Sequence, residues 1–582
     1  MAMKTIWEYK KAKNVKAITH LIETLDVSYI IAKLLVDRGI TTFDEAKQFF
    51  RPDIQDLHNP FLMKNMADAV KRVQQAIAND ENILVYGDYD VDGTTAVALM
   101  YQYLFGFTDK IAYYIPDRYK EGYGVSDQGV DFAIDNNFTL VIALDCGIKA
   151  VDKVKRAKQQ GVDFIICDHH TPGKQLPNAI ILNPKQKDCN YPFKELCGCG
   201  VGFKLVQAIN DAEALPFDHI DYLLDLVMVA IGADIVSVMG ENRIMCQYGL
   251  NKLNTKPRIG FKAILELAGK KPPLTVTDVV FTIAPRINAA GRIKSGNKAV
   301  ELLLTETIED AQRIGKEIHE YNAQRRELDK DITLEALEQI KNDNWLLNAK
   351  TTVVFNKNWH KGVVGIVASR LTETYYRPTI VLTESNGKAV GSARSVKEFD
   401  VYQAIDKCSD LLIQFGGHKY AAGLTMEIDN IPAFKLKFDA VVQELITKEQ
   451  QQHKLLIDSE IDFRDIFEAE RNTIPKFYRI LKQLAPFGPD NMIPLFVTKK
   501  LILADAPRVL KDEHLKFVCY QEDEPDLKID AIAFNLAHFK DVILNQPFNI
   551  AYHIDENHWN GKSTLQLMVK DIKKFEPEHL SF

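Results

Sequence analysis

Residues 83–93 read ILVYGDYDVDG, an apolar run followed at once by three aspartates, Asp88, Asp90 and Asp92. A short apolar run that ends in glycine and polar residues is typical of a buried strand. Three carboxylates at the end of such a strand would repel one another strongly unless cations neutralised them. The stretch therefore predicts a metal site at a strand end. An acidic turn or a calcium loop is the alternative, although the usual calcium loop ends its twelve-residue frame in a glutamate, which is absent here.

The strand at 83–86 begins a pattern that repeats along the chain. Each repeat consists of an apolar run, a polar turn and a helix-like stretch. The later runs lie at residues 111–115, 140–144, 164–167 and 179–182. Apolar runs of this length that alternate with helices indicate a parallel sheet covered on both faces. We expect an α/β fold, with further helices at 202–214 and 220–231.

Polar side chains also follow two later strands of this predicted sheet. Asp145 ends one strand, and Asp168, His169 and His170 follow the next. Because the carboxyl ends of neighbouring parallel strands meet at one crevice, Asp145 and His169 are expected beside Asp90 and Asp92. Asp234 follows a later predicted helix and would add an oxygen ligand, although a helix cap is the commoner role for such a residue.

The predicted donor set indicates the kind of ion. Carboxylate oxygens with one or two imidazoles suit Mn²⁺ or Mg²⁺, and enough carboxylates are present for two ions and a two-metal hydrolysis. Cys189, Cys197 and Cys199 could suggest zinc instead, but they have no second CxxC or His pair, so a glycine-rich turn is favoured. The few cysteines indicate reduced thiols rather than a disulfide framework.

The remaining chain is long enough for more domains, since 582 residues correspond to roughly three to five. Residues 307–344 predict a long connecting helix. A second α/β lobe follows, with strands at 352–355, 379–382, 388–393 and 421–426 and a helix around 402–413 that ends at Gly416 and Gly417. Five short strands after about residue 450 predict an OB-like β-barrel. Its aromatic residues Phe517, Tyr520, Phe534 and Trp559 fit the core or base stacking equally well.

The charge balance and hydropathy narrow the possible partners and location. A net charge of -7 excludes a global basic field, so a polyanion must meet a local basic patch. No segment approaches the roughly 18 apolar residues of a membrane span, and the N-terminus lacks the core of a secretory signal. These features predict a cytoplasmic protein without a membrane partner.

Several motifs together resemble the DHH phosphoesterase superfamily and, within it, the single-strand-specific exonucleases of the RecJ family. Besides GDYDVDG and the Asp168-His169-His170 triplet, they are IPDR (115–118), PRINAAGR (285–292), residues 360–371, GSARS (391–395) and GGH (416–418). The order of the motifs also matches, and they span most of residues 80–425.

The resemblance implies roles for individual residues. Metal ligands are expected at Asp90, Asp92, Asp145, His169 and Asp234. His170 is expected to contact the scissile phosphate as an electrophile or acid, and Asp88, close to the metal ligands, is the second catalytic candidate. The expected contacts to nucleic acid, above all to a 5′ phosphate, are Arg118, Arg286, Arg292, Ser392, Arg394, Gly417 and His418.

The resemblance also implies a domain plan and a function. The expected parts are an N-terminal helical segment (1–79), a DHH catalytic domain (80–240), a helical region with the connecting helix (241–345), a DHH-associated domain (346–450) and an OB-like nucleic-acid-binding domain (451–582).

The implied activity is 5′-to-3′ degradation of single-stranded DNA with a 5′ phosphate, in recombination and repair, by a monomer with a single-strand-binding protein and a helicase as candidate partners. A small-molecule or short-oligonucleotide phosphodiesterase and a non-catalytic replication scaffold are the alternatives.

Overall fold

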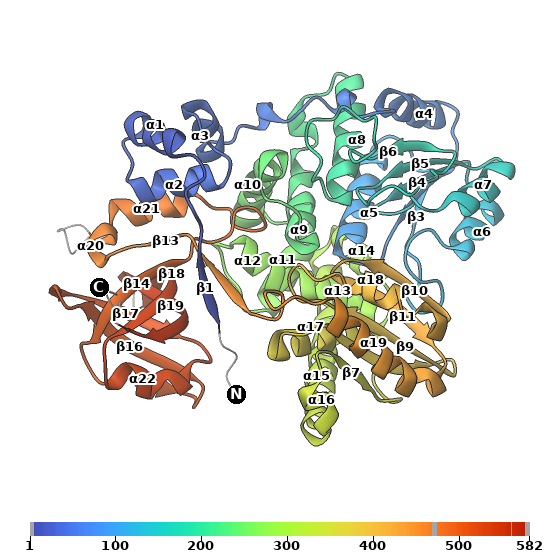
Figure 1. The fold of residues 1–582 in the computed structure, drawn as a ribbon. Coiled ribbons are helices and arrows are strands. Elements are labelled where there is room, and N and C mark those ends of the chain that lie inside the picture. Colours follow the sequence, from blue (N-terminus) through green and yellow to red (C-terminus); the bar gives the residue numbers. More distant parts are fainter. Residues whose placement is uncertain (1–4, 468–473, 560–561, 577–582) are drawn as a thin grey trace. The chain divides into compact units, whose positions relative to one another are not determined.

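The computed structural model describes residues 5–467, 474–559 and 562–576 (Figure 1). Their contacts divide the chain into two compact units. Residues 54–452 form one unit, and the described residues up to Asp53 form the other together with those from His453 onward. Within the described residues, no helix is both long and apolar enough to cross a membrane.

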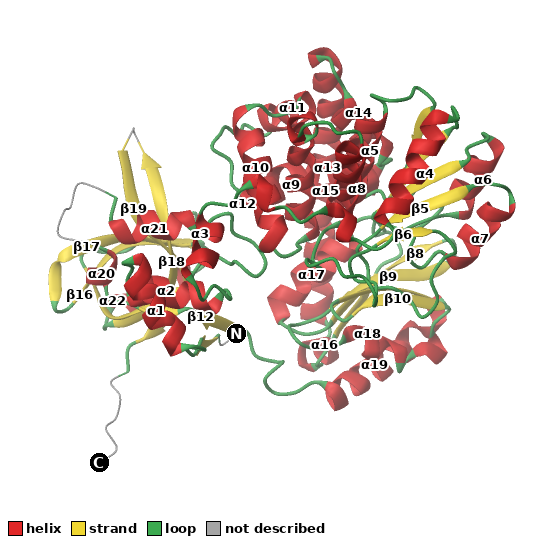
Figure 2. Cartoon of the chain, turned by 90° about the horizontal axis from the view of Figure 1, so that it is seen from above, coloured by secondary structure: helices red, strands yellow, loops and turns green. Residues whose placement is uncertain are grey.

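The first sheet of the larger unit is parallel throughout, in the order β3-β2-β4-β5-β6. Its strands are β2 (Ile83–Gly87), β3 (Ile111–Tyr114), β4 (Leu140–Leu144), β5 (Asp163–Cys167) and β6 (Ile180–Leu182). One apolar core lies between this sheet and α4 (Met66–Ala78), α5 (Val91–Leu104) and α8 (Gly198–Ala212), and a second lies under α6 (Asp127–Asp135) and α7 (Val151–Gln159). Figure 2 shows the strands between these helices. The predicted parallel sheet with two covered faces is confirmed.

Helices connect this sheet to a second one. They are α9 (Leu224–Asp234), α10 (Gly240–Thr255), α11 (Ile259–Leu267), α12 (Val276–Asp278), a π-helical turn (Val279–Ile283), α13 (Ala284–Ile293), α14 (Asn297–Leu304), α15 (Ile308–Asn342) and α16 (Asn344–Asn348). The 35 residues of α15 confirm the predicted long connecting helix. Its buried Asp329 accepts three hydrogen bonds from the Arg370 guanidinium of α17 (Val364–Tyr375), which holds the second lobe to the helix.

The second lobe contains a five-stranded sheet in the order β10-β11-β9-β8-β7. Its elements are β7 (Thr352–Phe355), β8 (Thr379–Ser385), β9 (Lys388–Arg394), α18 (Val401–Asp406), β10 (Gln414–His418), β11 (Ala421–Met426) and α19 (Ile431–Leu445).

The expected helix end at Gly416 and Gly417 is wrong, because α18 ends at Asp406 and both glycines lie in the edge strand β10. Gly417 has a φ of 147°, and a Cβ there would lie 2.4 Å from the Ala421 carbonyl oxygen. The tight β10–β11 hairpin therefore needs this glycine.

The smaller unit contains the OB-like barrel. Strands β14 (Phe496–Leu503), β18 (Phe548–Trp559), β19 (Lys562–Lys574), β17 (Glu524–Ala533) and β16 (His514–Gln521) are paired in that order, and β14 pairs with β16 to close the ring. β13 (Ser459–Glu460) and β15 (Arg508–Leu510) extend it, and α20 (Phe463–Ile466), α21 (Lys476–Gln483) and α22 (Lys540–Leu544) accompany it. The predicted barrel is confirmed.

The N-terminal segment joins this barrel unit. β1 (Ile6–Tyr9) pairs in parallel with β12 (Lys454–Ile457), and α1 (Val15–Leu25), α2 (Tyr29–Asp37) and α3 (Phe43–Phe50) follow. The domain boundaries expected from the sequence stay a prediction. Among the barrel aromatics, Phe517 is buried and Phe534 is exposed, while the side chain of Trp559 lies outside the described residues.

A buried ion pair anchors α8, the helix whose N-terminus reaches the predicted metal site. Lys204 and Glu241 are 0% and 1% exposed and lie 2.9 Å apart. Glu241 also accepts from the Tyr191 hydroxyl at 2.6 Å and from the His58 amide at 2.8 Å. Its removal would leave an uncompensated buried ammonium.

Glu241→Ala is therefore expected to lower the free energy of unfolding of the larger unit by about 3–5 kcal/mol, measured by urea denaturation. Glu266→Ala is the control, because Glu266 is exposed and its pairing with Lys262 is worth at most about 1 kcal/mol. Equal losses for the two variants would contradict the structural role of Glu241.

Candidate functional site

Two of the three aspartates after β2 are held by helix N-termini. Asp90 caps α5, since its Oδ1 accepts from the Gly93 amide at 3.0 Å. Asp92 lies in the first turn of α5 and is buried, and its two carboxylate oxygens accept from the Gly198 and Cys199 amides of α8 at 2.7 Å each. Two helix N-termini thus stabilise negative charge at one point.

Gly198 is needed for a close approach between α8 and β4. A Cβ at this position would lie 2.5 Å from the Asp145 Cβ and 2.6 Å from its Oδ1. No real Cβ tolerates such contacts, so a side chain here must displace Asp145.

We expect Gly198→Ala to reduce divalent-metal affinity on the order of tenfold and to lower the free energy of unfolding by about 1–3 kcal/mol. Mn²⁺ titration and thermal unfolding measure the two effects. Gly200→Ala on the same helix is the matched control, because its Cβ would meet its nearest neighbours at an ordinary 3.5 Å. Similar metal affinities for the two variants would argue against the Asp145 displacement.

His169 lies at the centre of the acidic cluster. Its Nε2 is 3.2 Å from Asp145 Oδ1, 3.6 Å from Asp234 Oδ2 and 3.9 Å from Asp92 Oδ2. His169 belongs to two groups of three residues whose ligand atoms lie within 4.8 Å of one another. One group is Asp145, His169 and His170, and the other is Asp92, His169 and Asp234. The structure therefore brings together four of the five predicted metal ligands from β4, β5, α5 and α9.

Asp90 belongs to neither triad, but it lines a cavity of about 200 Å³ together with Asp92 and Asp234. Asn288 and Arg292 of α13 complete the polar lining. The fifth predicted ligand thus faces the same space as two of the other four.

Burial and mutual repulsion shift the protonation of this cluster. Burial, and then the neighbouring aspartates, raise the pKa values of Asp92, Asp145 and Asp234 above the usual carboxyl range. Burial and the nearby His170 lower the pKa of His169, which keeps its imidazole neutral. Added positive charge among these groups would restore the ionised carboxylates, which is the electrostatic signature of a cation site.

His170 is oriented by Asp168. Its Nδ1 lies 2.8 Å from Asp168 Oδ1, and its amide donates to the same oxygen at 2.9 Å. Burial opposes charge on both groups, but their hydrogen bond lowers the pKa of Asp168 and raises that of His170. Because the ionised carboxylate only accepts, Nδ1 carries a proton, and Nε2 lies 3.2 Å from the Tyr123 hydroxyl.

Asp88 occupies a different position from the other acidic residues. It is fully buried, and its two oxygens accept from the Tyr89 and Gly124 amides at 2.7 Å each. Burial, and then Asp90, raise its pKa. The carboxylate therefore holds backbone rather than facing the cavity that Asp90 and Asp92 line.

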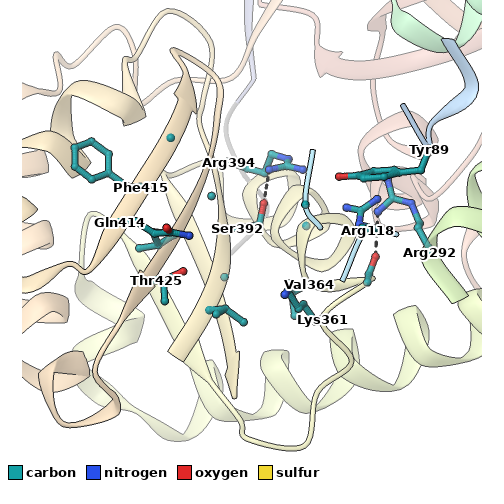
Figure 3. A pocket seen from close by; sticks show the side chains of 18 residues that line it. Tyr89, Arg118, Arg292, Lys361, Val364, Ser392, Arg394, Gln414, Phe415 and Thr425 are labelled. Carbon is teal, nitrogen blue, oxygen red and sulfur yellow. Dashed lines mark hydrogen bonds between the residues drawn. The ribbon is translucent and has the colours of Figure 1, made fainter. Parts of the chain in front are cut away.

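A larger pocket of about 560 Å³ lies between the two lobes (Figure 3). Arg118, Arg292, Arg394 and Lys361 bring positive charge to its lining. Figure 3 shows the three arginines gathered in one part of the pocket, away from Gln414 and Thr425.

In the part of the chain that the structure describes, these cations donate to few protein acceptors. Arg394 donates to the Ser392 hydroxyl at 2.6 Å, Arg292 donates to the Gly362 carbonyl at 3.0 Å, and the guanidinium of Arg118 lies over the Tyr89 ring. Burial and the other arginines lower the pKa of Arg292 to about 9. Like charges gathered in this way are the complement of an anion such as phosphate.

The remaining predicted nucleic-acid contacts lie outside this lining. Arg286 donates to His319 at 3.4 Å and to the Thr282 carbonyl at 2.7 Å, and it does not line the pocket. Gly416 lines the pocket, whereas Gly417 and His418 follow it along β10. His418 is close enough to Arg394 and His170 for both to lower its pKa, after the larger effect of burial.

Reasoning from sequence missed several groups at the site. The sequence pattern around Gly198 and Cys199 predicts only a glycine-rich turn, whereas both residues lie in the first turn of α8 and donate their amides to Asp92. The GCG run directly before an apolar helix is the signal that could have indicated this helix N-terminus. Lys361 carried no separate signal inside residues 360–371. All eight cysteines are free and buried, and Cys197 caps α8 by accepting from the Gly200 amide.

The comparisons with known proteins agree with this geometry. Family models match at residues 82–231 (DHH family, N-terminal domain), 348–444 (DHHA1 domain) and 457–571 (RecJ OB domain). The single-stranded-DNA-specific exonuclease RecJ of Bacillus subtilis is 36% identical over 98% of this chain and 71% of its own length.

Two crystal structures of RecJ from Thermus thermophilus are similar over nearly the whole chain. The complex with Mn²⁺ has a TM-score of 0.83 at 28% identity and covers 99% of this chain and 80% of its own. The complex with Mg²⁺ has a TM-score of 0.77 at 26% identity and covers 98% of this chain and 79% of its own. Because the Bacillus subtilis relative is 36% identical over 71% of its own length and the three domain matches follow in order, the chain belongs to the RecJ family of single-stranded-DNA-specific exonucleases.

Proposed function

We propose that this protein is a metal-dependent exonuclease that degrades single-stranded DNA from a 5′-phosphate end, in recombination and repair. The observation that carries the proposal is the position of Arg292, which lines both the acidic cavity and the arginine pocket. A strand end whose terminal phosphate lies in the pocket would therefore place its next phosphodiester at the acidic cluster.

The acidic cluster fits two Mn²⁺ or Mg²⁺ ions. Within the described residues, Asp145 Oδ1 and His169 Nε2 are buried and make no hydrogen bond, although buried polar atoms are normally hydrogen-bonded. Oxygen donors with one imidazole match these ions better than zinc. Asp90, Asp92, Asp145, His169 and Asp234 would hold them. When bound, the ions supply charge that neutralises the phosphodiester and lowers the pKa of water.

The chain's own residues orient the substrate around that centre. Arg118, Arg292 and Arg394, with Ser392, bind the oxygens of the terminal phosphate by charge-assisted hydrogen bonds. His170 keeps its Nδ1 proton on Asp168, and its imidazole contacts the scissile phosphate or its leaving oxygen as an electrophile or acid. Asp168 thus fixes the orientation of the imidazole.

The barrel supplies a second contact to the strand. OB-folds bind single strands through backbone charge and aromatic stacking, and we assign this role to the barrel, whose exposed Phe534 is one candidate stacking surface. We propose that the protein acts as a monomer, with a single-strand-binding protein and a helicase as partners.

The deciding experiment is digestion of long single strands labelled at either end, with and without a 5′ phosphate, in Mn²⁺ or Mg²⁺. Mononucleotide release from the 5′ end, faster with the phosphate, is expected. A dinucleotide supplies the comparison with a small-molecule phosphodiesterase. Preference for the dinucleotide, or release from the 3′ end, would overturn the proposal.

A further inference from the structure

The loop between β3 and α6 places a tyrosine hydroxyl on His170. Tyr123 Oη lies 3.2 Å from His170 Nε2 and 3.4 Å from the Asp145 carbonyl oxygen. Its ring also contacts the His170 ring edge to face, at 5.9 Å between centroids. Tyr123 is thus in contact with the side of the imidazole opposite to Asp168.

The backbone on both sides of Tyr123 has a conformation that needs glycine. Gly122 and Gly124 have φ values of 87° and 83°, in the region that favours glycine. Glycines at these two positions let the chain turn on both sides of Tyr123, and the direction of the Tyr123 side chain then depends on how the loop is anchored.

The anchor is Asp88. Its Oδ2 accepts from the Gly124 amide at 2.7 Å, while the Tyr86 hydroxyl donates to the Gly124 carbonyl at 3.0 Å. Tyr86 and Asp88 are both fully buried at the end of β2, so both backbone groups of Gly124 are attached to the strand. The other Asp88 oxygen is used by the Tyr89 amide. The buried carboxylate is therefore committed to holding this loop.

We propose that Asp88 and Tyr123 form one positioning unit for the reaction: Asp88 anchors Gly124, and Tyr123 then holds the His170 imidazole in its working orientation from the side opposite to Asp168. In this assignment Asp88 is a positioning residue rather than a metal ligand or a group that touches the DNA. The assignment rests on the proposed function, in which His170 contacts the scissile phosphate.

Tyr123→Phe tests the hydroxyl, because phenylalanine keeps the ring contacts with His170 and Tyr89. We expect kcat on 5′-phosphorylated single-stranded DNA to fall about tenfold, the effect of one lost hydrogen bond, with KM and Mn²⁺ affinity unchanged. Tyr103→Phe is the matched control. The Tyr103 hydroxyl is buried in the same domain, and within the described residues no hydrogen bond to it is found.

Asp88→Asn tests the anchor, since its amide group would face one of the two backbone donors. It is expected to lower kcat to a similar extent and to speed hydrogen exchange at the Gly124 amide, while Mn²⁺ affinity stays within about twofold of the unsubstituted protein. Hydrogen exchange and metal binding are both read without turnover. A large loss of Mn²⁺ affinity would overturn the assignment and make Asp88 part of the metal site.

The double variant decides whether the two residues act as a unit. If Asp88 acts through Tyr123, the double variant loses no more activity than the more impaired single variant, because each substitution breaks the same positioning chain. Multiplicative losses would overturn the proposal. An unsubstituted protein that does not degrade single-stranded DNA would instead refute the proposed function, so the two failures are distinguishable.

Discussion

Asp145→Asn is expected to lower kcat on single-stranded DNA by about a thousandfold or more in Mn²⁺ or Mg²⁺. Among the described residues, no hydrogen bond reaches the buried Asp145 oxygen beside His169. Ions at such a centre supply several kcal/mol of transition-state stabilisation, and each 1.36 kcal/mol is worth a factor of ten in rate. Single-turnover digestion measures the effect. Mn²⁺ titration should show a parallel loss of affinity.

The substitution to asparagine is chosen for the backbone. Asp145 has a φ of 58°, which asparagine adopts more readily than alanine, so the variant changes the charge with little strain. Asp131→Asn is the control, because Asp131 is exposed and pairs with Arg156 at the surface. Turnover by Asp145→Asn close to that of the control would contradict the two-metal assignment.

Arg394→Ala should reduce kcat/KM on 5′-phosphorylated strands by about a hundredfold and nearly abolish the preference over strands with a 5′ hydroxyl. Hydrogen bonds to charged groups contribute about 1.5–3 kcal/mol each, and a guanidinium can make two of them to one phosphate. The ratio of initial rates on the two substrates measures the preference. Arg394→Lys should recover only part of it, since an ammonium cannot make the paired contact.

A control on the same unit separates this effect from general charge. Arg313 on α15 is exposed and paired with Asp310 and Glu317, so Arg313→Ala should leave the ratio unchanged. If Arg394→Ala lowered activity equally on both substrates, Arg394 would serve the strand as a whole rather than its terminal phosphate.

Local sequence predicts most of the elements because the apolar runs have the lengths and spacing that strands and helices need. The run at 140–144 and the 35 residues of α15 are both visible in this way, and so is the barrel. The strand β10 was missed because two glycines after a helix-like stretch are the usual sign of a helix end. Its pairing with β11 depends on a tight hairpin that local pattern does not reveal.

Some residues of the candidate site could likewise be predicted from the sequence, and others could not. Asp90, Asp92, Asp145 and His169 could be grouped from sequence since parallel strands align their carboxyl ends. The hydrogen bonds from the Gly198 and Cys199 amides to Asp92 could not be predicted, because those residues are 106 and 107 positions from Asp92. Arg286 and Arg292 share a motif on α13, but only Arg292 lines the pocket. The sequence does not show this difference, because it depends on which face of α13 meets α15 and which meets the second lobe.

By itself, then, the sequence determined the fold class, the two catalytic lobes with their connecting helix, the barrel and the chemical character of the ligands, because each depends on short-range pattern. Only the tertiary structure decided which aspartates face the cavity and which hold backbone. Asp88 and Asp90 are two residues apart, yet one is bonded to the amides of Tyr89 and Gly124 and the other lines the acidic cavity. The difference arises because a buried carboxylate must be satisfied, and one of the two donors to Asp88, the Gly124 amide, comes from a loop that only the fold brings next to it.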